Sequence, residues 1–315
     1  MFTKEDFLAV KERIDEYIIT TPLREATVIS DKLGYPVFLK DETKQKTGAF
    51  KYRGVMNFLL SMPEDELKRG VITASSGNHG KAMSTAARER GIPATVVLPD
   101  TAPPIKIQAL KDVQARILFS EPQQRLQMGQ EIAEEEGLVF VHPFNDLKVI
   151  AGQSSIGLEI MNQCPDVERV VVPMGGGGLI TGIASAIKTF RPEIEVVGAE
   201  TLAVPKFTYN LPKEVLEPTP EMPSIADAIL SNMPGSNTII GVRNYVDRIV
   251  DVTEDNILRA LKMLVNEEGV HCEASSAVVL GALLQEEFSN KKTVLVISGG
   301  NISEEMLREY VGEIK

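Results

Sequence analysis

The chain has 315 residues, of which 43% are hydrophobic and 24% charged, a composition ordinary for a globular protein of about two domains. Its formal net charge of -11 argues against nucleic acid and anionic membranes as partners, because both select clusters of Lys and Arg. No apolar signal segment opens the chain and no apolar stretch approaches membrane-spanning length, so we expect a cytoplasmic protein. Its two cysteines, Cys164 and Cys272, are expected to be reduced.

Short β-branched runs alternate with longer amphipathic runs, a pattern typical of parallel strands joined by helices, so the predicted fold class is α/β. Nine strands are predicted, at residues 37–40, 71–74, 94–98, 115–119, 139–142, 169–173, 195–199, 248–252 and 293–297. Because nine strands exceed a comfortable single sheet, we expect two sheets in two domains. Residues 70–147 form the predicted small domain, and residues 1–69 and 148–315 the large one. Five prolines in residues 205–223 predict a surface excursion without a long regular element.

The segment 45–54, QKTGAFKYRG, carries a lysine at a turn that leads into a helix. Thr47 is predicted to cap the helix and Gly48 to let the chain turn tightly, which places Lys51 in the first turns. A lysine that is partly desolvated there has a lowered pKa and can form a Schiff base with a carbonyl compound. Taken alone, Lys51 is more simply interpreted as a solvated lysine on a helix face, an interpretation that loses once the glycine loop described below is considered.

Residues 73–80, TASSGNHG, follow a predicted strand and begin a helix. The hydroxyl groups of Ser75 and Ser76, the amide of Asn78 and the helix N–H groups suit a carboxylate. His79, in the same segment, is more simply interpreted as a buried structural histidine. The segment is therefore a candidate substrate site, with a structural turn as the alternative.

Four consecutive glycines, Gly175, Gly176, Gly177 and Gly178, close an apolar run and open a predicted helix at residues 179–187. Glycines can direct successive N–H groups to one point, and a helix N-terminus adds partial positive charge, so the loop predicts a phosphate site. The spacing fits neither the dinucleotide fingerprint nor the Walker loop. A phosphate site together with an imine-forming lysine describes pyridoxal phosphate.

Ser298 ends the last predicted strand and is followed by Gly299 and Gly300. Ligands of α/β sheets bind at the carboxyl ends of strands, so this hydroxyl is a further candidate for the same site. A strand-ending turn is the alternative.

On these residues the chain resembles the fold-type II pyridoxal phosphate enzymes of the threonine/serine dehydratase and serine racemase family, which have two domains like tryptophan synthase β. The resemblance covers nearly the whole chain. It rests on segments in family order at residues 21–23, 47–53, 75–80, 142–144, 150–153, 173–178, 225–227 and 298–301.

The resemblance implies a role for each matched residue. Lys51 would hold the cofactor, with Phe50 packed on its ring, Asn78 bound to the ring hydroxyl and Ser298 facing the pyridine nitrogen. The four glycines and Leu179 would bind the phosphate. The substrate carboxylate would be held by Ser75, Ser76, Gly77, Asn78 and His79. A homodimer is expected by the same analogy.

The expected activity is that of an ammonia-lyase, which converts L-threonine and L-serine to 2-oxobutyrate and pyruvate through Cα deprotonation by Lys51 and loss of the β-hydroxyl. Ser76 matches the second acid/base of the family's racemases, so a serine racemase using Lys51 and Ser76 stays open. A dehydratase for another β-hydroxy amino acid and a noncatalytic binding protein are further alternatives. Because the chain ends soon after Ser298, no regulatory domain is expected.

The racemases that the chain resembles hold a divalent cation through a Glu, a backbone carbonyl and an Asp. Glu200 and Val204 match the first two positions, but Lys206 stands at the third. An ammonium group is no ligand for a hard cation, which needs oxygen donors. We therefore expect no metal and hypothesise that Lys206 pairs with Glu200 in its place.

Overall fold

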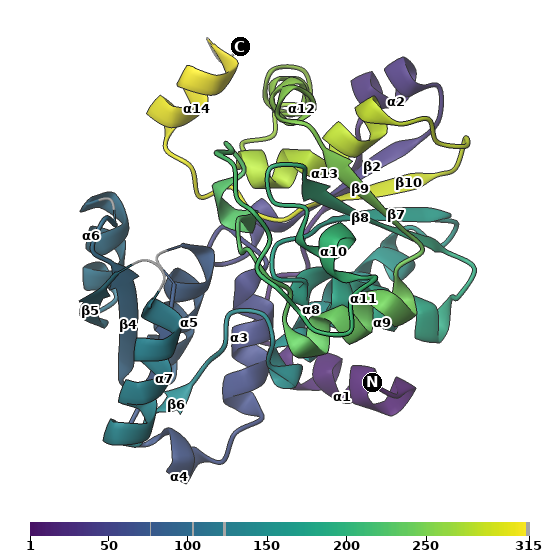
Figure 1. The fold of residues 1–315 in the computed structure, drawn as a ribbon. Coiled ribbons are helices and arrows are strands. Elements are labelled where there is room, and N and C mark those ends of the chain that lie inside the picture. The colour runs from purple at the N-terminus through teal and green to yellow at the C-terminus, as the bar shows by residue number, and fades with distance from the viewer. Residues whose placement is uncertain (76, 103, 122–123, 313–315) are drawn as a thin grey trace.

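The protein is described from a computed structural model that covers residues 1–75, 77–102, 104–121 and 124–312. Figure 1 shows two sheets that lie in separate lobes, each with helices packed against it. We call the four-stranded sheet with its helices the small lobe and the rest of the chain the large lobe. The predicted α/β architecture with parallel sheets flanked by helices is confirmed.

The large lobe contains a six-stranded sheet in the order β1-β2-β10-β7-β8-β9. Its strands are β1 (Leu23–Glu25), β2 (Val37–Asp41), β7 (Arg169–Pro173), β8 (Glu195–Thr201), β9 (Arg248–Val252) and β10 (Thr293–Ile297). All neighbours are parallel except β1, which pairs antiparallel with β2 at the edge.

The small lobe contains a four-stranded parallel sheet in the order β5-β4-β3-β6. Its strands are β3 (Val71–Ala74), β4 (Ala94–Pro99), β5 (Arg116–Ser120) and β6 (Val139–Phe140). All four fall within residues 70–147, so strand membership supports the small domain, whose boundaries stay a prediction.

Helices connect the strands throughout the described residues. The α-helices are α1 (Lys4–Ile14), α2 (Thr27–Leu33), α3 (Lys51–Leu60), α4 (Glu64–Leu67), α5 (Asn78–Glu89), α6 (Pro104–Asp112), α7 (Arg125–Glu136), α8 (Leu147–Gln163), α9 (Gly178–Phe190), α10 (Lys206–Asn210), α11 (Ser236–Tyr245), α12 (Glu254–Asn266), α13 (Ala274–Gln285) and α14 (Glu304–Val311). Two 3-10 turns are η1 (Glu42–Lys44) and η2 (Asp227–Ile229). None of these helices is both long and apolar enough to cross a membrane.

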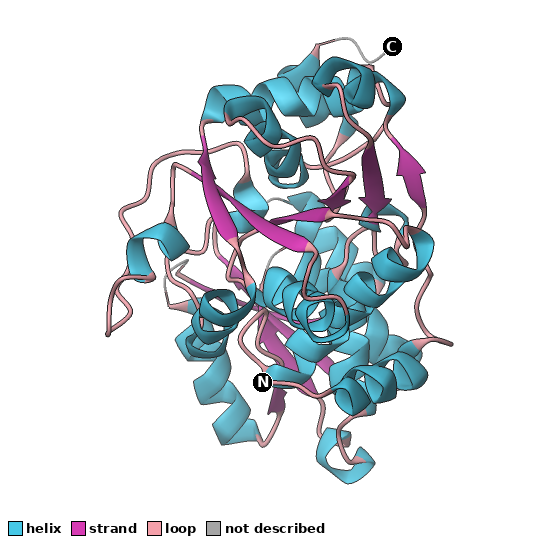
Figure 2. Ribbon diagram, turned by 90° about the vertical axis from the view of Figure 1, so that its right-hand side faces the viewer, coloured by secondary structure: helices cyan, strands magenta, loops and turns pink. Residues whose placement is uncertain are grey.

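The six-stranded sheet is covered on both faces, which explains its continuous Val/Ile/Leu runs. Val171 and Leu295 pack with α2, α12 and α13 on one face, whereas Val170 and Val294 pack with α8 and α9 on the other. Figure 2 shows helices on both sides of these strands. Adjacent strand residues point to opposite faces, so every residue of β7 and β10 is buried.

Most predicted strands match the observed ones within two residues at each end. Residues 141–142 do not extend β6, and β1 was not predicted. The segment 205–223 has no long regular element, but Lys206 and Phe207 in its short α10 are fully buried, so a purely surface excursion is wrong there. Both cysteines are free and buried.

Candidate active site

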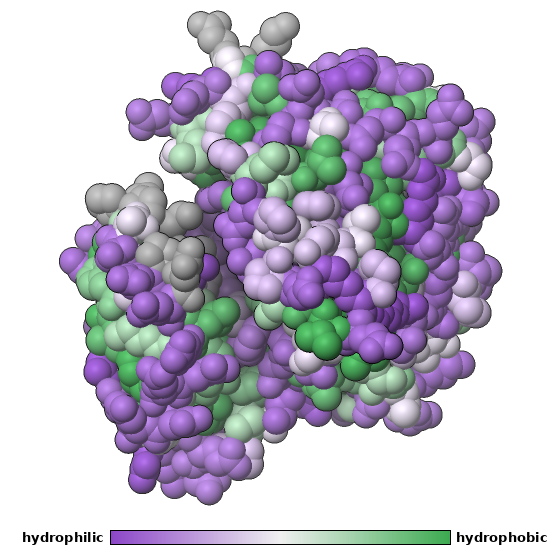
Figure 3. Space-filling model, viewed as in Figure 1, coloured by the Kyte–Doolittle hydropathy of each residue, from purple (hydrophilic) through white to green (hydrophobic). Residues whose placement is uncertain are grey.

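The topology brings the predicted site residues to one region. In the large sheet β8 and β10 lie on opposite sides of β7, and in the small sheet β4 and β6 lie on opposite sides of β3. Ligands of open α/β sheets bind outside the carboxyl ends of strands at such switch points. The glycine loop and Ser298 follow β7 and β10, and Ser75 follows β3. Figure 3 shows the surface hollowed between the two lobes.

Lys51 is the first residue of α3, as predicted, but the turn before it is built differently. Gly48 has a φ of 76°, in the left-handed region that favours glycine, and its carbonyl accepts the N–H of Gly300 at 2.9 Å. The prediction that Thr47 caps the helix is wrong, because α3 has no side-chain cap and the buried Thr47 hydroxyl has no partner among the described residues. Long-range backbone bonds to Ser298 and Gly300 hold the turn before α3.

The Lys51 amine lies at the junction of the two lobes. Its Nζ atom donates a hydrogen bond to the Pro143 carbonyl oxygen at 2.7 Å and lies 5.0 Å from the centre of the Phe50 ring. Desolvation lowers the pKa of Lys51 to about 8. A lysine with this pKa supplies neutral, nucleophilic amine near physiological pH.

The residues that follow β6 form a turn organised by His142. Its Nδ1 atom accepts the backbone N–H groups of Phe144 at 3.2 Å and Asn145 at 3.0 Å, so Nδ1 carries no proton and the ring is neutral. Desolvation and the nearby Lys51 charge lower the pKa of His142 to about 4. The His142 and Phe144 rings meet edge to face, 4.7 Å between centroids. The turn thus presents the Pro143 carbonyl to Lys51 and the Phe144 ring to the glycine loop.

The backbone of the glycine loop lies close to Phe144, and two of its positions leave no space for a side chain. A Cβ added at Gly176 would lie 2.3 Å from the Phe144 ring, and one at Gly178 would lie 2.7 Å from the Phe144 carbonyl oxygen. Gly177 has a φ of 92° and precedes α9 without a side-chain cap. The first N–H groups of α9 therefore have no capping side chain, and an anion would satisfy them.

Ser298 is brought beside this junction by the backbone. Its carbonyl accepts the N–H of Phe50 at 3.0 Å, and its hydroxyl lies 3.1 Å from that of Ser276. The Ser298 side chain is almost fully buried. A neutral hydroxyl pair, rather than a carboxylate, therefore stands at the carboxyl end of β10.

The segment after β3 also reaches the site. Gly77, the N-cap residue of α5, has no side chain, so among the described residues no N-cap side chain bonds to the first N–H groups of α5. His79 is buried, its Nε2 lies 3.1 Å from the Val141 carbonyl, and burial lowers its pKa to about 3. These contacts favour the structural interpretation of His79. Ser76 lies outside the described residues.

Asn78 is bound by two side chains of the large lobe, Glu273 and Asn301. Its Nδ2 donates to Glu273 Oε1 at 3.0 Å and Oε2 at 3.1 Å, and its Oδ1 accepts from Asn301 Nδ2 at 2.7 Å. Lys81 donates to Asn301 Oδ1 at 2.8 Å. We call these four residues the inter-lobe cluster. Asn301 ends the predicted segment 298–301, whereas Glu273 lies outside the predicted segments.

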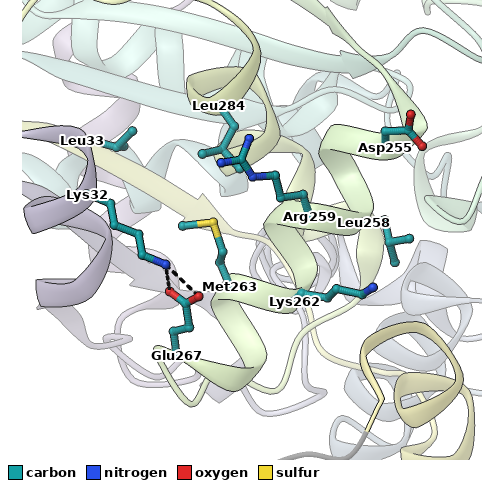
Figure 4. Close-up of a pocket in the computed structure, with 9 residues that line it drawn as sticks. All are labelled: Lys32, Leu33, Asp255, Leu258, Arg259, Lys262, Met263, Glu267 and Leu284. Atoms are coloured by element: carbon teal, nitrogen blue, oxygen red, sulfur yellow. Dashed lines mark hydrogen bonds and ion pairs between the residues drawn. The ribbon is translucent and has the colours of Figure 1, made fainter.

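A second hollow lies away from the site, between α2 and α12, with a volume of about 660 Å³ (Figure 4). Lys32 and Glu267 form an ion pair across it at 2.6 Å, and Arg259 and Lys262 lie at its rim. No residue of the predicted site lines it. The hollow carries no chemistry that would connect it with Lys51.

Known proteins are similar to this chain over most of its length. Residues 14–300 match the family described as pyridoxal-phosphate dependent enzyme. The chain is 40% identical to L-threonine ammonia-lyase of Thermotoga maritima, over 99% of this chain and 79% of the relative. It is 37% identical to serine racemase of Dictyostelium discoideum, over 95% of both chains.

Among solved structures, the chain is similar to the crystal structure of Dictyostelium discoideum serine racemase, with a TM-score of 0.89 and 35% identity, over 96% of this chain and 99% of that one. The predicted family and its pyridoxal phosphate cofactor are confirmed. The chain therefore belongs to the family of pyridoxal-phosphate dependent enzymes.

Proposed function

We propose that the chain is an ammonia-lyase that converts L-threonine to 2-oxobutyrate and L-serine to pyruvate, with release of ammonia. The observation that carries the proposal is the Lys51 amine, held at 2.7 Å by the Pro143 carbonyl beside the Phe144 ring that covers the glycine loop. The names of two relatives, L-threonine ammonia-lyase at 40% identity and L-threonine dehydratase catabolic TdcB at 36% identity, support the choice of substrate.

The residues present fit the cofactor. Gly175, Gly176, Gly177 and Gly178 leave no room for Cβ atoms at two positions against Phe144, and the α9 N-terminus has no side-chain cap. The phosphate would be held there, together with the N–H of Leu179. Lys51 provides the amine for the covalent link, with its pKa lowered to about 8 by desolvation.

Three further residues would orient the cofactor ring. Phe50 would pack on it, because the Phe50 ring is already 5.0 Å from Lys51 Nζ. Ser298 would face the pyridine nitrogen with a neutral hydroxyl. Asn78 would bind the ring hydroxyl, and to do so it would share its amide with Glu273, to which it donates in this structure.

When bound, pyridoxal phosphate accepts the electron pair left by the broken Cα–H bond. Lys51, once its amine is free and neutral, takes the Cα proton, a role for which a pKa near the working pH is favourable. The α5 N-terminus, with Ser75, Gly77 and Asn78, would bind the substrate carboxylate through backbone N–H groups and polar side chains. His79 would support this loop from its buried position.

A serine racemase is the second candidate, favoured by the 37% identity with the serine racemase of Dictyostelium discoideum. Inversion at Cα needs a second proton donor on the face opposite Lys51. By the sequence resemblance that donor is Ser76, and Ser76→Ala would then abolish racemisation while leaving elimination.

The experiment follows three products at once. Purified protein with pyridoxal phosphate is incubated with L-serine, L-threonine and bulkier β-hydroxy amino acids, and oxo acid, ammonia and D-isomer are measured. We expect equal amounts of oxo acid and ammonia, formed faster than D-serine. Faster accumulation of D-serine than pyruvate would establish the racemase instead. Absence of any product, with Lys51→Ala indistinguishable from the natural protein, would indicate a noncatalytic binding protein.

A homodimer and a cytoplasmic location are retained as proposals from the sequence. The relatives support an enzyme that acts on a small amino acid. Sedimentation equilibrium of the purified protein measures the oligomeric state directly, and a monomer at micromolar concentration would contradict the first proposal.

A further inference from the structure

A buried ion pair lies directly behind the glycine loop. Lys206, the first residue of α10, and Glu200, in β8, are both fully buried, and Lys206 Nζ lies 3.2 Å from Glu200 Oε2. The Glu200 carboxylate also accepts the backbone N–H groups of Phe207 at 3.1 Å and Thr208 at 2.9 Å. The pairing hypothesised from the sequence is therefore present, and the carboxylate is fully hydrogen-bonded.

The second contact of Lys206 is with the loop itself. Its Nζ donates to the Met174 carbonyl oxygen at 3.2 Å, and Met174 directly precedes Gly175. On the other side, the N–H of Met174 donates to the Ala199 carbonyl at 2.8 Å. The residue that leads into the four glycines is thus fixed at both its donor and its acceptor.

The loop is fixed at two further points from the same side. The Thr238 hydroxyl donates to the Gly176 carbonyl at 2.7 Å. A Cβ added at Gly177 would lie 2.5 Å from the ring of Phe207, the residue next to Lys206. The carbonyls at positions 174 and 176 are thus bound to protein donors and are directed away from a ligand.

Burying the charges of Lys206 and Glu200 costs free energy, because both groups lose their hydration. Burial raises the pKa of Glu200 and lowers that of Lys206, and their mutual attraction offsets only part of this cost. A buried ion pair is weak evidence for stability, since apolar residues of similar size often replace such pairs without loss. A positioning role accounts for the contact with Met174, which a pair that only stabilised the core would not need.

We propose that Lys206 is a positioning residue for the cofactor phosphate. Its ammonium group, held by Glu200, fixes the Met174 carbonyl, so that the N–H groups of the glycine loop stay directed at the phosphate. A loop of four glycines loses much backbone freedom on ordering, and fixing it beforehand removes that cost from binding. The inference rests on the proposed binding of the phosphate at this loop.

The test compares two ligands that differ only in the phosphate. Apo protein is titrated with pyridoxal phosphate and with pyridoxal, and both dissociation constants are measured by absorbance and protein fluorescence. Lys206→Met is expected to weaken pyridoxal phosphate at least tenfold and pyridoxal less than twofold. Equal weakening of both ligands, or no change in either, would overturn the proposal.

A matched control is Lys40→Met. Lys40 is equally buried and paired with Glu159, but its other contacts are with Thr21 and Gln163 rather than the glycine loop. In Lys40→Met, the dissociation constant of pyridoxal divided by that of pyridoxal phosphate is expected to stay the same as in the natural protein. If Lys40→Met changed this ratio as much as Lys206→Met, the effect would belong to any lost buried charge and the inference would fail.

Two further measurements test the role of Lys206 if Lys206→Met does not fold, and test the phosphate site itself. If Lys206→Met does not fold, the double variant Lys206→Met with Glu200→Gln removes both charges together. The dissociation constant of pyridoxal divided by that of pyridoxal phosphate is then expected to fall at least fivefold. The natural protein itself tests the phosphate assignment. If it bound pyridoxal as tightly as pyridoxal phosphate, the glycine loop would not be the phosphate site, and the proposed function would fail before the role of Lys206 arose.

Discussion

Lys51 Nζ donates a hydrogen bond to the Pro143 carbonyl oxygen at 2.7 Å, and so links the first residue of α3 to the turn that follows β6 of the other sheet. The predicted nucleophile is thereby oriented by the small lobe before any ligand binds. Lys51 and Pro143 lie far apart in the sequence, and only the pairing of the lobes brings them together.

Lys51→Ala is expected to abolish lyase activity and the near-visible absorbance of the protein with pyridoxal phosphate, because the amine that would form the covalent link is removed. Lys51→Arg is expected to lose both the activity and the absorbance as well, since a guanidinium group stays protonated. The measurements are oxo-acid formation and the absorbance spectrum. Lys44→Ala, an exposed lysine in η1, is the control and should behave as the natural protein. Retention of the absorbance band in Lys51→Ala would contradict the assignment.

The rate at which apo protein forms its covalent link with pyridoxal phosphate is expected to rise with pH and to reach half its maximum near pH 8. Desolvation lowers the pKa of Lys51 to about 8, and only the neutral amine attacks a carbonyl, so the reactive fraction grows as pH passes that value. Stopped-flow absorbance between pH 6.5 and 9.5 gives the midpoint. A midpoint near 10, the usual value for an exposed lysine, would show that the amine is solvated.

Gly176→Ala is expected to weaken pyridoxal phosphate binding by more than tenfold, because its Cβ would lie 2.3 Å from the Phe144 ring. Gly175→Ala is the matched control, since the nearest atom would be 3.3 Å away, and it should cost much less. The double variant Gly176→Ala with Phe144→Ala should recover part of the affinity by removing the ring. Equal effects of the two single variants would refute a steric origin.

Arg53→Met is expected to destabilise the protein by about 3–5 kcal/mol, the usual cost of breaking a buried ion pair on one side. The fully buried Arg53 guanidinium is 2.7 Å from Glu42 and also pairs with Glu159, so its loss leaves buried carboxylates without their cation. The urea midpoint of unfolding measures the change. Arg116→Met, which breaks an exposed pair with Glu136, should leave the midpoint nearly unchanged. Similar midpoints for both variants would disprove this account.

Four strands, at residues 71–74, 169–173, 248–252 and 293–297, were predicted with their observed bounds. Three of them, β3, β7 and β10, are fully buried and form nearly continuous β-branched runs, because both faces of each sheet are covered. β9 lies at the edge of its sheet and is partly buried. β1 was not predicted because only Leu23 of its three residues is apolar. Residues 141–142 leave β6 because His142 uses its ring to organise the next turn.

The parts of the site that depend on short sequence patterns could be predicted. The parts that depend on contacts between residues distant in sequence could not. The glycine loop and the position of Lys51 follow from short patterns, and the structure brings them together. Pro143 lies in the predicted segment 142–144, but its contact with Lys51 joins residues distant in sequence. Glu273 and Thr238 also act through distant partners, which no local pattern marks. Thr47 shows the same limit, because the turn that contains it is held by backbone bonds to Ser298 and Gly300, which are distant in sequence.

The turn after β6 gives the protein a built-in sensitivity to acid. Both N–H groups that close it end on one unprotonated nitrogen of His142, whose ordinary pKa of 6.5 is lowered to about 4. Between these values the unfolded chain takes up more protons than the folded one, so stability falls as the solution is acidified. A proton on Nδ1 of His142 would repel both N–H donors. The Phe144 ring would then lose its fixed position against the glycine loop. Loss of coenzyme in mild acid should therefore precede global unfolding.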